Sequence, residues 1–152
     1  LLELLIVLLI LSTLIGSINF YVLKPYKLED LAVDVATQLK SAQTISKYQN
    51  RIISFSLNAE RLTFYIFDIF SGSWDQKINS EFELRNIEFN NQVKKASVYL
   101  SEINQLDEKI IINSNPINEN ILIELVGEKI CRIFSDSMND ITIDCQNEKN
   151  KY

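Results

Sequence analysis

The sequence predicts an α+β fold, in which a long N-terminal helix precedes a domain of antiparallel β-strands. The chain begins with a membrane-length apolar stretch, "LLELLIVLLILSTLIGSINFYVLKP". Apolar residues then recur at steps of three and four, which is typical of an amphipathic helix. Beyond Asn50, short runs alternate between apolar and polar residues, as half-buried strands do. We expect a transmembrane helix segment over 1–23, the amphipathic second half of the helix over 24–50 and a β-rich globular domain over 51–152.

Composition excludes several functional classes. The chain of 152 residues has 15 basic and 20 acidic side chains, a formal net charge of −5, and no histidine. The acidic balance argues against a nucleic-acid partner. A Ser or Cys nucleophile usually needs a histidine base, and the 3 glycines do not form a phosphate-binding loop. We therefore expect no enzyme, no cofactor and no metal site.

The first apolar stretch has the length of a membrane span. Residues 4–23 carry no charge, and a helix of this length covers about 30 Å, the thickness of a bilayer core. The competing interpretations are a signal peptide, which needs a basic start and a shorter core, and a buried soluble helix. Ser12 and Gly16 lie on one helix face, where small residues allow close helix packing. Pro25 should then kink or briefly break the helix.

Glu3 is the anomaly of this stretch, because leucines flank it on both sides. A carboxylate near a helix N-terminus gains from the helix dipole, which is the simplest explanation. A charge exposed to lipid is costly, however, and usually has a partner. A partner on another subunit would make this acid an assembly signal.

The second half of the helix carries one apolar stripe. Acidic residues precede basic ones along it, in agreement with the helix dipole. Together with the first half it predicts one kinked helix over 1–50, about 75 Å long at about 1.5 Å per residue. The stripe needs a sheet to cover it. Its members are Leu28, Leu31, Ala32, Val35, Leu39, Ala42 and Ile45.

The remainder predicts about seven or eight strands. We expect a hairpin over 51–69, an irregular segment from Trp74 and a late hairpin whose arms, 109–113 and 120–126, flank an Asn- and Pro-containing turn. The alternation assigns most aromatic side chains to the core. The expected strands are 51–58, 60–69, 82–89, 95–100, 109–113, 120–126, 129–134 and 140–145.

The two cysteines and a group of acids lie near the C-terminus. Cys131 and Cys145 form a candidate disulfide in an extracytoplasmic domain, or they are two separate small buried residues. Asp136, Asp140 and Asp144 have the residue type that calcium prefers. Their spacing does not match an EF-hand, and a solvated turn and strand face is the simpler interpretation.

The segment "LLELLIVLLILSTLIG" resembles the N-terminal helix of type IV pilins and of type II secretion pseudopilins. In that superfamily a prepilin peptidase removes a basic leader, and the new N-terminus is methylated. The resemblance implies that residues precede Leu1 in the processed chain. It also implies that Glu3 pairs with the N-terminal amine of a neighbouring subunit. Lys24 and Lys27 alone would place the domain in the cytoplasm, whereas the resemblance implies the periplasm.

A helix ending in "LKSAQTISKYQNR", followed by the strand "IISFSLN" and an aromatic strand, is similar to the GspH/FimT group of this superfamily. The late hairpin adds to the similarity, although Asn and Pro stand where that group has glycine. The resemblance implies a pilin-like fold and a minor pseudopilin of a type II secretion system, anchored by a single span in the bacterial inner membrane. Its implied partners are other pseudopilin subunits, the inner-membrane assembly platform and the prepilin peptidase.

The alternative is a minor pilin of a type IV pilus, with a role in adhesion or DNA uptake. The negative net charge favours secretion, and neighbouring secretion genes would separate the two. A third class, a single-span enzyme or receptor, predicts that changes at Glu3 are tolerated.

Overall fold

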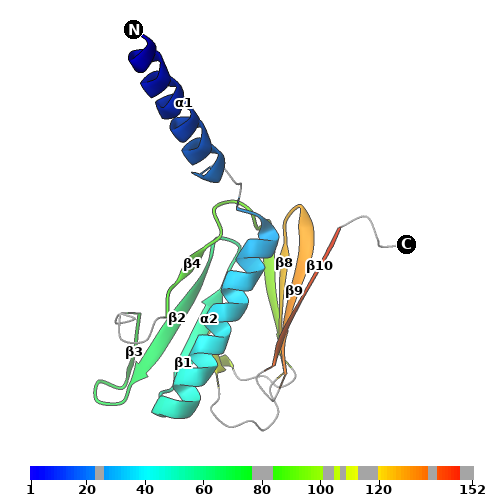
Figure 1. The fold of residues 1–152 in the computed structure, drawn as a ribbon. Helices are drawn as coiled ribbons and strands as arrows, with labels where there is room; N and C mark the ends of the chain where they lie inside the picture. The colour runs from blue at the N-terminus through cyan, green and yellow to red at the C-terminus, as the bar shows by residue number, and fades with distance from the viewer. Residues whose placement is uncertain are drawn as a thin grey trace.

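The computed structural model describes residues 1–22, 26–76, 84–100, 105–106, 109–112, 120–136 and 140–147. For 14–22 and 105–106 it describes the backbone alone. The chain is an α+β protein with two helices and two antiparallel sheets (Figure 1). Helix α1 extends away from the domain, and α2 lies along both sheets.

The two helices are α1 (Leu2–Val22) and α2 (Leu28–Gln49). Before α2, Lys27 has an extended backbone with φ −92° and ψ 159°, and its N–H donates to the Asp30 carboxylate at 3.0 Å. The first turn of α2 is therefore capped as a new helix start. The prediction of one helix over 1–50 is corrected to two helices, in line with the alternative of a short break. Pro25 itself lies outside the described residues.

The predicted membrane span is only partly covered by the structure. Among the described residues, no helix combines the length and the apolar character needed to cross a membrane. The side chains of 14–22 and all of 23–25 lie outside the description. The transmembrane assignment for 1–23 stays a prediction.

Ten strands among the described residues form two sheets. The first has the order β3-β2-β1-β7-β6, with β4 paired to β2, and the second has the order β10-β9-β8-β5. The strands are β1 (Ile53–Leu57), β2 (Arg61–Asp68), β3 (Ser73–Asp75), β4 (Ile87–Glu88), β5 (Lys95–Leu100), β6 (Gln105–Leu106), β7 (Lys109–Ile112), β8 (Ile121–Val126), β9 (Lys129–Ser135) and β10 (Ile141–Asn147).

The early hairpin is confirmed and the late one is wrong. Strands β1 and β2 pair with Phe55 opposite Phe64, as expected. The predicted arms of the late hairpin lie in different sheets, since β7 pairs with β1 and β8 pairs with β5 and β9. Pairing with β1 sets Ile110 opposite Phe55 and Ile112 opposite Ile53, and all four side chains are buried. Shared burial across β1 thus determines the partner of β7, rather than adjacency in the sequence.

The apolar stripe of α2 forms the centre of the core. All seven predicted members are buried, and Ala32, Val35 and Ala42 have no exposed surface. The helix contacts β7 of the first sheet and β9 and β10 of the second. One helix face therefore covers both sheets and joins them in a single core.

Three polar side chains on the buried side of α2 also contact the domain. The Gln38 Oε1 accepts from the Arg85 N–H at 2.8 Å, the Gln43 Nε2 donates to the Ser135 hydroxyl at 2.8 Å, and the Ser46 hydroxyl donates to the Ile112 carbonyl at 3.3 Å. These bonds fix the position of α2 along its own axis, which apolar contacts alone determine less strictly.

Several strand and burial predictions are refined by the structure. Trp74, expected to begin an irregular segment, lies in β3 opposite Phe67 of β2. Of the strand expected over 82–89, only β4 is a strand among the described residues. Phe55, Phe64 and Phe89 are fully buried as predicted. The other aromatic residues whose side chains the structure describes are not fully buried, and the exposed ones are Tyr26, Tyr48, Phe70, Tyr99 and Phe134.

Replacing Leu31 by alanine should destabilise the domain by about 2–5 kcal/mol, because the change removes a fully buried side chain and leaves a cavity. Val33 lies on the same helix with 52% of its surface exposed. Its replacement by alanine should change the free energy of unfolding by no more than about 0.5 kcal/mol. Urea unfolding followed by the fluorescence of Trp74 measures both. Equal effects at the two positions would contradict the assignment of the buried face.

Candidate functional site

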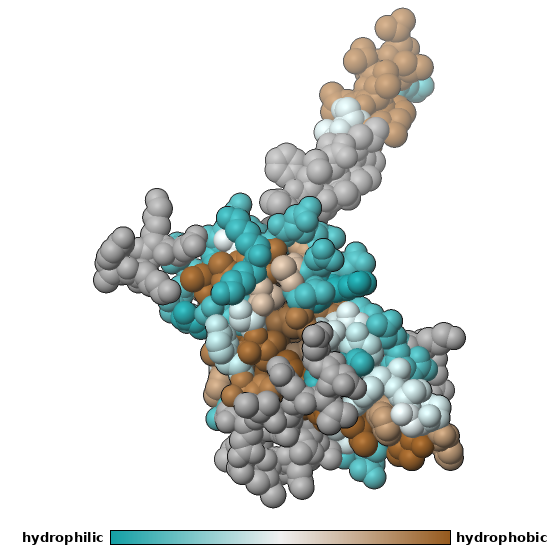
Figure 2. Space-filling model, turned by 180° about the vertical axis from the view of Figure 1, so that it is seen from behind, coloured by the Kyte–Doolittle hydropathy of each residue, from teal (hydrophilic) through white to brown (hydrophobic). Residues whose placement is uncertain are grey.

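The described part of helix α1, residues 2–13, presents an apolar surface on nearly all sides. Every described side chain of this helix is exposed, including the leucines that flank Glu3. Figure 2 shows the described outer part of α1 as an almost continuous apolar surface, separate from the domain. Glu3 lies in the first turn of α1, where its charge faces the positive end of the helix dipole. A helix that is apolar on every face is typically buried in protein or lipid, and no other described residue covers this part of α1.

The small and polar residues of α1 are only partly described. The Ser12 hydroxyl donates to the Leu9 carbonyl at 2.9 Å, and the Thr13 hydroxyl donates to the Ile10 carbonyl at 2.8 Å. Both hydroxyls therefore have hydrogen-bond partners within the helix and need none from a neighbouring molecule. Gly16 lies beyond the described side chains, and the packing role of Ser12 and Gly16 stays a prediction.

Tyr26 attaches the start of α2 to the globular domain. Its carbonyl accepts from the Gln92 Nε2 at 2.6 Å, and its hydroxyl donates to the Asp34 carboxylate. Asp34 also forms an ion pair with Arg85 at 3.3 Å. Partial burial raises the pKa of Tyr26, and the hydrogen bond to Asp34 raises it further, so the hydroxyl stays a donor at physiological pH. The residues just before α2 are therefore held in place by Gln92 on one side and by Asp34, which is itself paired with Arg85, on the other.

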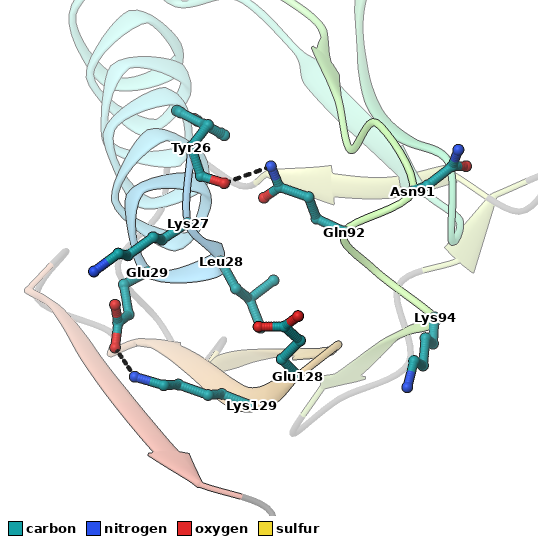
Figure 3. Close-up of a pocket in the computed structure, with 9 residues that line it drawn as sticks. All are labelled: Tyr26, Lys27, Leu28, Glu29, Asn91, Gln92, Lys94, Glu128 and Lys129. Carbon is teal, nitrogen blue, oxygen red and sulfur yellow. Dashed lines mark hydrogen bonds and ion pairs between the residues drawn. The ribbon is translucent and has the colours of Figure 1, made fainter. Parts of the chain in front are cut away.

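A cavity of about 680 Å³ opens beside this attachment point. Figure 3 shows it between the first turn of α2, the segment before β5 and the turn that joins β8 to β9. The Lys129 ammonium forms an ion pair with the Glu29 carboxylate across one side. Lysines outnumber acids in the wall, and the lining residues are Tyr26, Lys27, Leu28, Glu29, Asn91, Gln92, Lys94, Glu128 and Lys129.

Gly127 allows two backbone segments to approach closely beside this cavity. A Cβ atom at this position would lie 2.2 Å from the Gln92 carbonyl oxygen, so only glycine allows the two backbones to approach this closely. The Lys94 N–H also donates to the Val126 carbonyl at 2.7 Å. These contacts join the segment before β5 to the β8–β9 turn and give the cavity a fixed wall.

The structure joins Cys131 and Cys145 in a disulfide, with an S–S distance of 2.08 Å between opposite positions on β9 and β10. Of the three C-terminal acids, Asp136 accepts the backbone N–H of Asp140 at 2.9 Å and Asp144 accepts a hydrogen bond from the Gln146 amide at 2.7 Å. In the part of the chain that the structure describes, no group of three acidic, cysteine or histidine side chains is placed to hold a metal ion.

Sequence reasoning missed the attachment point and the cavity. Their residues come from 26–29, 91–94 and 128–129, which no motif connects. The one local signal was Gly127 in a turn between two strands, since an isolated glycine marks either a turn or a close backbone approach.

Comparison with known proteins supports the fold. No protein-family model and no curated protein matches the chain. Among solved structures, the chain is similar to the minor pseudopilin EpsH from the Type 2 Secretion System of Vibrio cholerae, with a TM-score of 0.59 and 10% sequence identity. The match covers 76% of this chain and 94% of the EpsH chain. The chain therefore has a pilin-like fold.

Replacing Tyr26 by phenylalanine should lower the free energy of unfolding by about 1 kcal/mol, because the Asp34 carboxylate loses a hydrogen bond at a partly exposed site. Tyr48 is the matched control, since 76% of its surface is exposed. Its replacement by phenylalanine should have no measurable effect in the same urea titration. A neutral result at both positions would show that the Tyr26 hydroxyl does not fix the junction.

The disulfide predicts a mass increase on reduction and a loss of stability when both cysteines are replaced. Without reductant the intact chain should be lighter by two hydrogen atoms than after reduction. Replacing both Cys131 and Cys145 by alanine should destabilise the domain by about 3 kcal/mol, because the link closes a loop of 14 residues. Thr142→Ser, at an exposed position of β10, is the control. Identical masses with and without reductant would disprove the bond.

Proposed function

We propose that this chain is a structural minor pseudopilin of a type II protein secretion pseudopilus, placed near the filament tip. The observation that carries the proposal is the pilin-like fold, which is similar to the minor pseudopilin EpsH. The apolar surface around α1 and the acid in its first turn add support, because they suit a helix that packs against other helices. No catalysis is involved.

Before assembly the subunit is stored in the bacterial inner membrane. Residues 1–23 form its single span, and the globular domain lies in the periplasm. A prepilin peptidase produces the mature N-terminus, which is then methylated. An exposed apolar helix is stable in lipid because the backbone polar groups of its interior are hydrogen-bonded within the helix.

Assembly replaces lipid around α1 by the helices of other pseudopilins at the inner-membrane platform. Glu3 is costly in lipid while it has no partner. The N-terminal amine of a neighbouring subunit supplies the opposite charge, and the pair sets the axial position at which the new helix joins. Close packing near Ser12 and Gly16 then brings the helices together.

Replacing Glu3 by alanine or glutamine tests this role in cells without the wild-type copy. We expect normal amounts of membrane-inserted protein but strongly reduced incorporation into the pseudopilus. Leaving one member of a buried ion pair alone costs about 3–5 kcal/mol, which corresponds to a loss of about a hundredfold to several thousandfold. Crosslinking to other pseudopilins and the amount of secreted protein are the two measurements.

Glu60→Ala is the matched control, because Glu60 is an exposed acid in the turn between β1 and β2. Secretion should be unchanged in that variant. Normal secretion and normal pilus assembly in the Glu3→Ala strain would disprove an assembly role for this acid. A strain that loses type IV pili but still secretes would identify the chain as a minor pilin instead.

A further inference from the structure

The tip of the β2–β3 hairpin presents two apolar side chains to solvent. Phe70 is 100% exposed and Ile69 is 67% exposed. Keeping an aromatic and an aliphatic side chain in water is unfavourable. A contiguous apolar pair on a defined turn is typical of an interaction surface.

The turn that carries this pair is held in one conformation. The Phe70 N–H donates to the Asp68 carboxylate at 3.0 Å, and the Gly72 N–H donates to the Asp68 carbonyl at 2.8 Å. Gly72 has a φ of +64°, which glycine adopts without strain. A hydrogen bond from Ser71 lowers the pKa of Asp68, so the carboxylate that organises the turn stays charged at neutral pH.

The base of the hairpin is also ordered. The rings of Phe67 and Trp74 meet edge to face, with their centroids 5.2 Å apart, directly below the turn. The apolar pair at the tip is therefore already in position before any partner arrives. Binding through such a surface loses little conformational entropy.

The hairpin tip and the cavity lie at opposite ends of the domain. In Figure 1 the tip lies at the end farthest from α1, below the label of β3, whereas the cavity residue Leu28 begins α2 beside α1. Figure 2 shows apolar atoms at the lower end of the domain, far from α1. The tip therefore points away from the bilayer that the same chain would enter.

The two features match in size and charge. The cavity of about 680 Å³ is within the range that accommodates small ligands, and hence two side chains. Residues 68–75 carry two acids and no base, and the Arg51 guanidinium, which precedes β1, acts electrostatically on one of them, Asp68. The cavity wall has three lysines and two glutamates, which gives it a net charge of +1. Lys129 is paired with Glu29, and Lys94 is exposed without an ion pair to another described residue. A lysine ammonium also interacts favourably with the face of a phenyl ring.

We propose that the hairpin tip of one copy, with Ile69 and Phe70, docks into the cavity beside Lys94 of a second copy. Tip and cavity occupy different ends, so the contact is head to tail and does not close on itself. The inference rests on the proposed filament function, to which it adds a contact between globular domains.

Photo-crosslinking of the purified full chain in detergent tests the contact. Benzoylphenylalanine replaces Phe70, and isotope-labelled and unlabelled chains are mixed, so that crosslinks between copies contain both labels. We expect crosslinks from position 70 to 26–29, 91–94 or 128–129 of the other copy. The matched control carries the same group at Tyr99, an exposed aromatic position on β5, and should give no such product.

Two further variants separate the contact from nonspecific association. Lys94→Glu should reduce the crosslink at least tenfold, because it places an acid opposite the acidic hairpin. Lys40→Glu reverses a charge at an exposed position of α2 and should leave the yield unchanged. Ile69→Ala should also reduce the yield while leaving the fluorescence of Trp74 unchanged, which shows that the hairpin is still folded.

Crosslinks from position 70 to detergent or added lipid, to the same hairpin of a second copy, or to nothing would overturn the proposal. The outcome is separable from the assembly role of Glu3, which the strain carrying Glu3→Ala measures in cells. If that strain fails to assemble while the crosslink is absent, only the docking contact is wrong. If the crosslink forms while Glu3→Ala assembles normally, the docking contact stands and the assembly role of Glu3 is wrong.

Discussion

Both sheets depend on the apolar stripe of α2. The helix contacts β7 on one side and β9 and β10 on the other, so a single helix face completes two sheets that have no strand in common. Leu31, Val35 and Leu39 are almost fully buried in this shared core. A sheet with one apolar face is not stable alone in water, and here the same helix covers both. Substitutions in this stripe should therefore lower the stability of both sheets.

The position of α2 also organises the surfaces at both ends of the domain. Just before its start, the hydrogen bond from Gln92 to the Tyr26 carbonyl holds the chain near the point where α1 and α2 connect. Gly127 lets the β8–β9 turn approach the backbone of Gln92 beside the cavity. Beyond the end of α2, β1 and β2 lead to the hairpin that carries Phe70. Because polar contacts from Gln43 and Ser46 prevent the helix from sliding, the two ends keep a fixed separation.

The parts that the sequence predicted are those with a local periodic signal. The stripe of α2 and the β1–β2 hairpin are visible in the spacing of apolar residues over a few turns. The partner of β7 was missed because neighbouring strands usually pair, whereas here burial of Ile110 against β1 outweighs proximity in the sequence. The attachment point and the cavity could not be predicted, since hydrogen bonds such as that from Gln92 to Tyr26 connect residues far apart in the chain. The cysteine spacing left the disulfide open, because two strands must first be paired for the sulfurs to meet.

The order of elements has a consequence for synthesis. Helix α2 is made early, but the strands that cover its stripe, β7, β9 and β10, come from the last third of the chain. The first sheet is also completed late, because β1 pairs with β7, which is synthesised much later. Closing the long loop between these two strands has an entropic cost. Until β7, β9 and β10 have left the ribosome, the strands that contact α2 most extensively are missing and the stripe is only partly covered. A nascent chain in that state exposes the surface that drives aggregation, so it depends on being shielded until β10 is in place.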